Sequence, residues 1–338
     1  MDKEKKEQKV KDKIVERPND DIRTVSFTKI VETYQQRFAA IEALKLKNTD
    51  CMQKIGKLAL GHQPFTEASS KQVVRAVEVF CKMLQMPVEV KMFTLELLER
   101  FMLFYFESEF GHKLYLLNQT NLDESMGKSW EALYESVPIY LIACIQIAGK
   151  YDNRDLSFAT PKAICKCLKK LGYLTTELDL TNAEMKVLVT LNYELNFVTR
   201  YGAVEDLIST RRSRNFLDHA DSIFKKSIEL LDLLIHDHRK IFDEFLQNKG
   251  LDMAASKKIN NLELQQAEYD SLWIAAATIA AATKLIVIKH YSQNFFHKLS
   301  EEVLKELAED LINTRTEHEL RMLTYVLCQA YLKNVAKK

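Results

Sequence analysis

Apolar residues recur every three or four positions along most of the chain, which is the spacing typical of amphipathic helices. Between Pro64 and Pro87, one such stripe predicts a helix whose first N–H groups Ser69 or Ser70 can cap. Its apolar positions are Val73, Val74, Val77, Phe80, Cys81 and Leu84. A second stripe predicts the next helix and consists of Phe93, Leu97, Leu98, Phe101, Phe104 and Tyr105. Because alternation with a period of two is hard to find, and the chain has only eight glycines and five prolines, the predicted fold class is all-α.

The segment 137–148 is apolar on every side except at Gln146, so it predicts a helix that other helices surround. It gives way at once to a polar stretch that begins with Lys150. The following helix is predicted to start at Pro161, with Thr160 as its cap, and to end before Gly172.

The helix predicted over residues 176–192 carries a carboxylate, Glu184, within an apolar face. The apolar members of that face are Leu180, Val187, Leu188 and Leu191. An unpaired buried carboxylate would cost several kcal/mol, so the pattern predicts a partner or an interface. Two alternatives stay open: Glu184 reaches the rim, where it is solvated or pairs with Lys150 or Lys186, or it faces another protein.

Helical patterns continue beyond residue 208 without a visible sequence repeat. Residues 217–245 predict one long or broken helix, and residues 271–288 predict a second core helix rich in small residues. Since this run contains Lys284 and falls short of the ~20 apolar residues that a membrane span needs, no membrane segment is predicted. The predicted divisions are 1–24 (a disordered charged tail, not a signal peptide), 25–68 (an N-terminal helical segment), 69–208 (a first bundle) and 209–335 (a second bundle).

Composition indicates a globular protein without a strong general attraction to nucleic acid. The chain is 47% hydrophobic and 28% charged, and its net charge is only +1. The best basic cluster, Arg211, Arg212 and Arg214, is interpreted as a solvated linker, which argues against direct DNA binding.

No pattern for catalysis, metal binding or cofactor binding stands out. Cys165 and Cys167 lack a second pair at zinc spacing, and His236 and His238 are interpreted as surface residues because their spacing differs from that of zinc enzymes. The chain also lacks a phosphate loop and a nucleophile elbow. We therefore expect no enzyme activity, no cofactor and no metal.

Three stretches resemble a cyclin box: LELLERFM (95–102), YLIACIQIAGKYDNRD (140–155) and TNAEMKVLVTLNYELNFVTRYGAVEDLI (181–208). The resemblance covers about residues 69–208, while the second half matches only in architecture. Cyclins are regulatory subunits in which the first of two five-helix bundles binds a cyclin-dependent kinase. The resemblance thus implies two tandem five-helix cyclin-like bundles with an additional N-terminal helix.

The resemblance also implies where a kinase would bind. In cyclins, a lysine that ends the third helix and a glutamate in the fifth face the kinase, and these fall on Lys150 and Glu184. Tyr151, Phe101 and Leu188 are expected to supply an apolar rim. For Phe101 and Leu188, ordinary core packing is the alternative.

Some family features are replaced in this chain. SSKQVVRAVEVF stands where cyclins carry their substrate-docking segment, so docking of short basic-hydrophobic motifs is in doubt. Glu99 occupies the place of an aspartate that pairs with a buried arginine, so that pair is expected to be lost. Val198-Thr199-Arg200 replaces a Pro-Thr-Pro segment.

Among cyclins, the likeness is greatest to a group that acts in meiotic crossover maturation. The expected function is a non-catalytic regulator of crossover formation on meiotic chromosomes in the nucleus. Its expected partners are a cyclin-dependent kinase and meiotic recombination proteins. No membrane is expected among its partners. The alternatives are a kinase-independent scaffold for recombination proteins, a cell-cycle or transcriptional cyclin, and a nucleic-acid-binding module.

Overall fold

The computed structural model describes residues 39–50, 71–106, 108, 123–151, 160–170, 172–210, 219–249, 267–290, 293–311 and 316–336. The predicted charged tail and the arginine cluster at 211–214 lie outside these residues. The chain divides into a unit that ends at Ala43 and a unit from Leu44 to Lys338. The elements below belong to the second unit.

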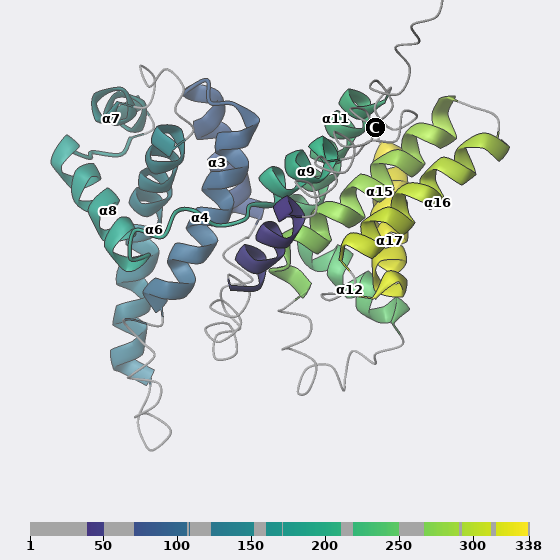
Figure 1. Ribbon diagram of the computed structural model, residues 1–338. Coiled ribbons are helices and arrows are strands. Elements are labelled where there is room, and N and C mark those ends of the chain that lie inside the picture. Colours follow the sequence, from purple (N-terminus) through teal and green to yellow (C-terminus); the bar gives the residue numbers. More distant parts are fainter. Residues whose placement is uncertain are drawn as a thin grey trace, which may run out of the picture. The chain divides into compact units, whose positions relative to one another are not determined.

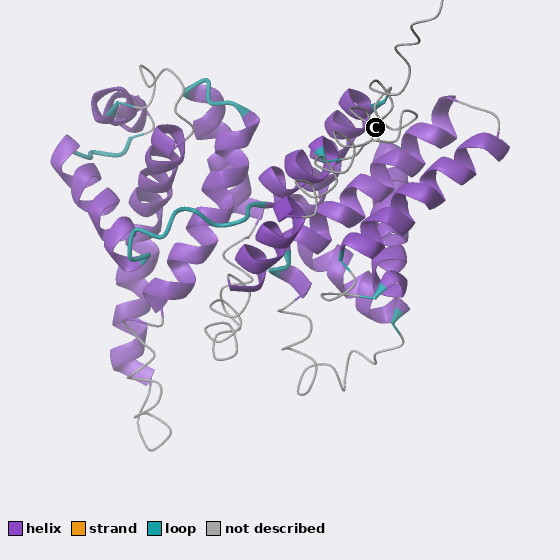
Figure 2. Ribbon diagram, in the orientation of Figure 1, coloured by secondary structure: helices purple, strands orange, loops and turns teal. Residues whose placement is uncertain are grey.

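The described residues form helices and contain no strand, which confirms the all-α prediction (Figures 1 and 2). The labelled helices are α3 (Lys71–Met83), α4 (Val88–Phe106), α6 (Asp123–Tyr151), α7 (Pro161–Lys170), α8 (Glu177–Thr190), α9 (Arg200–Ser209), α11 (Ala220–His236), α12 (His238–Asn248), α15 (Ser271–His290), α16 (Gln293–Asp310) and α17 (Glu317–Val335). No helix in this described part is both long enough and apolar enough to span a membrane.

Helix α6 is the centre of the first hydrophobic core. It packs against α4 and α8, and side chains from α3 and α7 complete the same cluster (Figure 1). Residues 141–149 are buried without interruption, as the all-round apolar pattern predicted. Gln146 is fully buried among them, and its amide has no hydrogen-bond partner among the described residues.

Helix α15 has the same central position in the second core. It contacts α9, α11, α16 and α17, and its residues 271–283 are all buried. Helix α9 packs with this group, and Val198, just before it, belongs to the same cluster. Val74 and Met92, from α3 and α4, also belong to this second cluster.

The helix ends follow local chemistry that is visible in the sequence. Thr160 accepts a hydrogen bond from the backbone N–H of Ala163 at 3.3 Å, which confirms it as the cap of α7. Gly172 has a φ of +88°, and its N–H and that of Tyr173 bond to carbonyls in the last turn of α7. Thr176 caps α8 through a reciprocal pair of bonds with Asp179.

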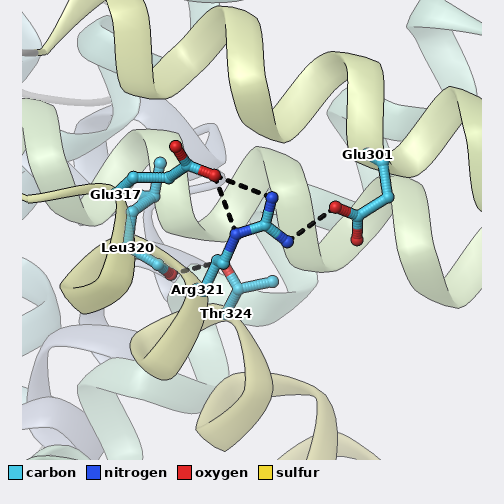
Figure 3. A network of polar contacts seen from close by, with 5 residues as sticks. All are labelled: Glu301, Glu317, Leu320, Arg321 and Thr324. Atoms are coloured by element: carbon cyan, nitrogen blue, oxygen red, sulfur yellow. Dashed lines mark hydrogen bonds and ion pairs between the residues drawn. The ribbon is translucent and has the colours of Figure 1, made fainter.

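Arg321 ties two helices of the second group together (Figure 3). Its guanidinium donates to Glu317 Oε1 within α17 at 2.7 and 2.9 Å, and to Glu301 Oε2 in α16 at 2.6 Å. Beside it, the Thr324 hydroxyl donates to the carbonyl of Leu320 at 2.7 Å. All three charged side chains are at least 40% exposed, so these pairs orient α16 and α17 more than they stabilise them.

Candidate functional site

Lys150 and Glu184 meet at the surface of the first group of helices. Lys150 lies in the last turn of α6, and Glu184 lies in the middle of α8. The Lys150 Nζ atom is 2.5 Å from Glu184 Oε1, and the two side chains are 44% and 13% exposed. The charged end of α6 thus supplies the partner that the misplaced carboxylate requires. Lys186, the other candidate partner, lies over the ring of Tyr105 instead.

Two physical factors place Lys150 here. A cation at the C-terminus of a helix is favoured because the helix dipole is negative at that end. Glu184 points its carboxylate toward the same place from a neighbouring helix, since α6 and α8 pack side by side. The result is a half-exposed lysine that a nearly covered carboxylate holds in position.

Tyr151 projects from the same end of α6 and is held by a column of stacked groups. Its ring stacks on Phe93 at 4.9 Å with an interplanar angle of 8°, and Phe93 stacks on Phe197 at 5.2 Å. The guanidinium carbon of Arg100 lies 4.2 Å from the centroid of the Phe197 ring. Because Tyr151 is 47% exposed and Arg100 is buried, this column runs from the interior to the surface.

Phe101 does not contribute to a surface rim. Its side chain is fully buried, with its ring 4.9 Å from Tyr140 and 5.4 Å from Tyr105. The alternative of core packing therefore describes Phe101, and contact with a partner from this position would require the core to open. Leu188 is half-buried and packs against the same core, so it is only partly accessible.

Helix α8 also carries apolar side chains on its solvent side, which the sequence patterns did not single out. Leu178, Met185 and Val189 are exposed and, at positions i, i+7 and i+11, lie on one side of the helix. The Tyr193 hydroxyl bonds to the sulfur of Met185 at 3.5 Å and extends this row. We call these four residues the α8 outer stripe.

The turn before α8 enlarges this exposed apolar surface. Tyr173 is exposed, and Leu174 is 92% exposed. Helix α8 is therefore apolar on two sides, one against the core and one toward solvent. A signal for this was present in the sequence, since Leu178, Met185 and Val189 fall outside the apolar face that contains Leu180 and Val187.

Buried charges lie where α4 meets the start of α9. The Glu96 carboxylate accepts the backbone N–H of Arg200 at 2.9 Å, and Arg200 Nη2 is 3.9 Å from Glu99 Oε2. Arg200 Nη2 also donates to the carbonyl of Glu268 at 2.9 Å. Glu99 was expected to lack a buried arginine, but Arg200 provides one from within the replaced Val-Thr-Arg segment.

The acids of this junction are shifted by their surroundings. Burial raises the pKa of Glu96 to about 7, although Arg200 opposes the shift. Burial, followed by the charge of Glu99, raises the pKa of Glu268 to about 8. Burial also raises the pKa of Glu99 itself. These groups sit inside the fold, so we assign them a structural role.

One set of potential metal ligands occurs among the described residues. Ligand atoms of Glu78, Asp232 and His236 all lie within 4.8 Å of one another. The Lys91 ammonium already contacts two of them, at 2.5 Å from Asp232 and 3.5 Å from Glu78. His236 in turn is 2.9 Å from the same Glu78 oxygen. A lysine cation thus balances these carboxylates.

The prediction that His236 and His238 are surface residues was wrong in part. His236 is partly covered and paired, as described above. His238 is partly buried with its ring 4.7 Å from that of Phe242, and burial lowers its pKa to about 3. The His238 ring is therefore neutral at pH 7 and packs against Phe242.

The chain has curated relatives with which it can be compared. No protein-family model matches it. It is similar to human cyclin N-terminal domain-containing protein 1, with 26% identity over 217 residues, which are 62% of this chain and 64% of the human protein. The mouse protein of the same name is 24% identical over 210 residues, 60% of each chain. The matched region spans less than two thirds of the length of either relative.

Proposed function

We propose that this cyclin-like protein is a non-catalytic regulatory subunit of a cyclin-dependent kinase and promotes meiotic crossover formation. The names of the human and mouse relatives support its cyclin-like character. The crossover role rests on the sequence resemblance to cyclins of that group. In this proposal the protein acts in the nucleus on meiotic chromosomes, together with meiotic recombination proteins.

The observation that carries the kinase proposal is the Lys150–Glu184 pair beside exposed apolar residues. Protein interfaces combine aromatic and apolar anchors with a few charged groups that fix orientation. Tyr151 and the α8 outer stripe supply the aromatic and apolar anchors, and the 2.5 Å ion pair supplies the charged groups. A kinase helix that packs here would bury side chains that water now covers, and this burial would favour binding.

The pair has hydrogen-bonding capacity for such a partner. An ammonium has three N–H donors, and Glu184 accepts one of them from Lys150. The other two can donate to acceptors on a kinase, while Glu184 keeps the lysine in place. By resemblance to cyclins, packing against the regulatory helix of the kinase would shift the kinase population toward its active arrangement.

The proposal can be tested by capturing partners from germline extract. Wild-type protein and the Lys150→Ala/Glu184→Ala variant serve as baits, with recovery read by mass spectrometry. Loss of both charges should cost about 2–5 kcal/mol of binding if they are buried against a kinase. The matched control is Lys333→Ala/Glu244→Ala, which removes the same kind of ion pair, 3.1 Å long, from the second group of helices.

The expected result is a cyclin-dependent kinase bound by wild type and control but lost from the Lys150→Ala/Glu184→Ala bait. Recovery of recombination proteins by all three baits, without a kinase, would reject the kinase mechanism and favour the scaffold alternative. Kinase recovery by all three would reject this surface as the binding site.

A further inference from the structure

A cavity of about 50 Å³ lies among α3, α4, α6, α9, α11 and α12, where residues of both hydrophobic cores line it. Most of its described lining is apolar and includes Val74 and Leu98. Three polar side chains complete this lining, namely Glu99 on α4, Arg200 on α9 and His238 on α12. Since one water needs roughly 10–15 Å³ of cavity volume, there is room for a few waters.

Arg200 brings a buried donor to this cavity. Its side chain is only 8% exposed, and its Nη2 atom donates to the carbonyl of Glu268 at 2.9 Å. The Nε–H of the same guanidinium has no hydrogen-bond partner among the described residues. A buried N–H without an acceptor destabilises a fold, and native proteins supply such groups with a protein or water acceptor. The cavity that Arg200 lines is a place for that acceptor.

Glu99 and His238 provide the complementary acceptors. Glu99 forms a side-chain hydrogen bond with Tyr269, and a carboxyl group has further lone pairs in either protonation state. Burial, followed by the charge of Arg200, lowers the pKa of His238 to about 3. Its ring is therefore neutral at pH 7 and has one nitrogen that accepts hydrogen bonds. The described polar lining thus combines one N–H donor with two acceptors.

We infer that this cavity is an internal hydration site, in which ordered water accepts the Nε–H of Arg200 and donates to Glu99 and His238. Water suits all three groups because it accepts and donates at once, and buried waters make about three hydrogen bonds. An apolar molecule would leave Nε without an acceptor. A chloride ion would accept from Nε but could not donate to the other two groups.

The site gives the two cores a water-mediated connection. Helix α4 carries most of its buried residues in the first core, whereas α9 and α12 belong to the second. Water that bridges Glu99 to Arg200 and His238 therefore links the two groups of helices, next to the direct bond between Glu96 and Arg200. This inference does not depend on the proposed function, because it involves no partner protein.

NMR on the full chain tests the site, with labelled methyl groups of Val74 and Leu98 as reporters. Both side chains are buried and line the cavity, so bulk water does not reach them. We expect nuclear Overhauser cross-peaks between these methyls and long-lived water. Leu180 and Val187 are the matched controls, because they are fully buried in the first core but do not line the cavity. They should show no such cross-peaks.

Xenon and chloride distinguish hydration from the other two occupants. Xenon enters dry apolar cavities, so saturable shifts of the Val74 and Leu98 methyls under xenon would overturn the inference. Shifts of these methyls on titration with chloride at constant ionic strength would also overturn it, in favour of an anion site. Wild-type protein without water cross-peaks at either reporter would do the same.

Two variants test which groups hold the water. Arg200→Met keeps a long side chain but removes the donor, and His238→Phe keeps a ring beside Phe242 but removes the acceptor. The water cross-peaks should disappear in the first variant and weaken in the second. Circular dichroism checks that each variant folds, and His238→Phe decides alone if Arg200→Met does not. Unchanged cross-peaks in a folded variant would overturn the assigned contacts.

Discussion

The carboxylate of Glu96 in α4 accepts the backbone N–H of Arg200, the first residue of α9, at 2.9 Å. The contact joins residues 104 positions apart and links the helix that lines the first core to the helix that opens the second. Arg200 also contacts Glu99 and the carbonyl of Glu268. The charge of Arg200 lowers the pKa of the Glu96, Glu99 and Glu268 carboxyls, but burial raises each pKa by more than this charge lowers it.

Stability should fall as pH rises toward neutrality. Burial raises the pKa of Glu96 to about 7 and that of Glu268 to about 8, from an ordinary value of 4.5. Between about pH 4.5 and pH 8 the folded chain binds more protons than the unfolded chain, so the free energy of unfolding decreases as pH increases. Each carboxyl contributes at most about 1.4 kcal/mol per pH unit.

The measurement is urea unfolding at several pH values between about 5 and 8, the window that these two pKa values define. Glu96→Gln keeps an oxygen that can accept the N–H of Arg200 but cannot ionise, so it should show a shallower decrease. A variant with the wild-type slope would show that Glu96 does not titrate in this range.

The Lys150–Glu184 pair should matter little for stability. Because the lysine is nearly half exposed, breaking the pair is expected to cost less than about 1 kcal/mol in urea unfolding. The exchanged variant Lys150→Glu/Glu184→Lys keeps an ion pair between α6 and α8 but reverses both charges toward a partner. It should lose only about 1 kcal/mol of stability, because a carboxylate replaces the cation at the C-terminus of α6, and it should fail to bind a kinase. Normal binding by this variant would assign the pair a purely structural role.

Lys91 should be a stabilising cation at the contact between α3, α4 and α11. Its side chain is only 15% exposed and lies between Glu78 and Asp232. Lys91→Met should lower the free energy of unfolding by about 1–3 kcal/mol, because the carboxylates lose a charged hydrogen-bond partner. Thermal unfolding would measure this loss.

The same variant should acquire sensitivity to zinc. Without the ammonium, Glu78, Asp232 and His236 are left with ligand atoms within 4.8 Å of one another. Zinc should then raise the melting temperature of Lys91→Met but not that of wild type, since ligand binding to the folded state stabilises it. Adding His236→Ala should abolish the effect. A zinc response that survives this second change would place the ion elsewhere.

Gly172 should be required at the end of α7. Its φ of +88° is a conformation that side chains with a Cβ disfavour, while the space around it is open. Gly172→Ala should therefore cost about 1–2 kcal/mol from the backbone alone. Gly172→Asn should cost less, because asparagine tolerates this conformation better. Equal stability of all three proteins in urea unfolding would show that this turn can end differently.

Local features of this chain were accessible from the sequence because their causes lie within a few residues. A helical period, a threonine that caps a first turn and a glycine that ends a last turn depend on neighbours along the chain. This is why the all-α class, the buried helix around residues 141–149, the cap at Thr160 and the turn at Gly172 could be predicted. The unusual position of Glu184 was also visible as a break in an apolar stripe.

Only the tertiary structure decided which groups meet. A stripe shows that a helix has an apolar face, but the neighbouring helices determine whether each side chain on it is covered. Phe101 and Leu188 looked alike as rim candidates, yet packing against Tyr140 and Tyr105 buries Phe101 completely. The α8 outer stripe stays exposed because no described helix covers that side.

Pairings across long sequence separations were likewise beyond local patterns. The periodicity around Glu184 allowed Lys150 or Lys186 as a partner, and the packing of α6 against α8 selected Lys150, 34 residues away. Tertiary packing likewise decided that α9 belongs to the second core and that Arg200 contacts Glu96. By itself, the sequence determined the helices and their ends, because those depend on short-range chemistry. The fold determined the partners, because they depend on which surfaces the collapsed chain brings together.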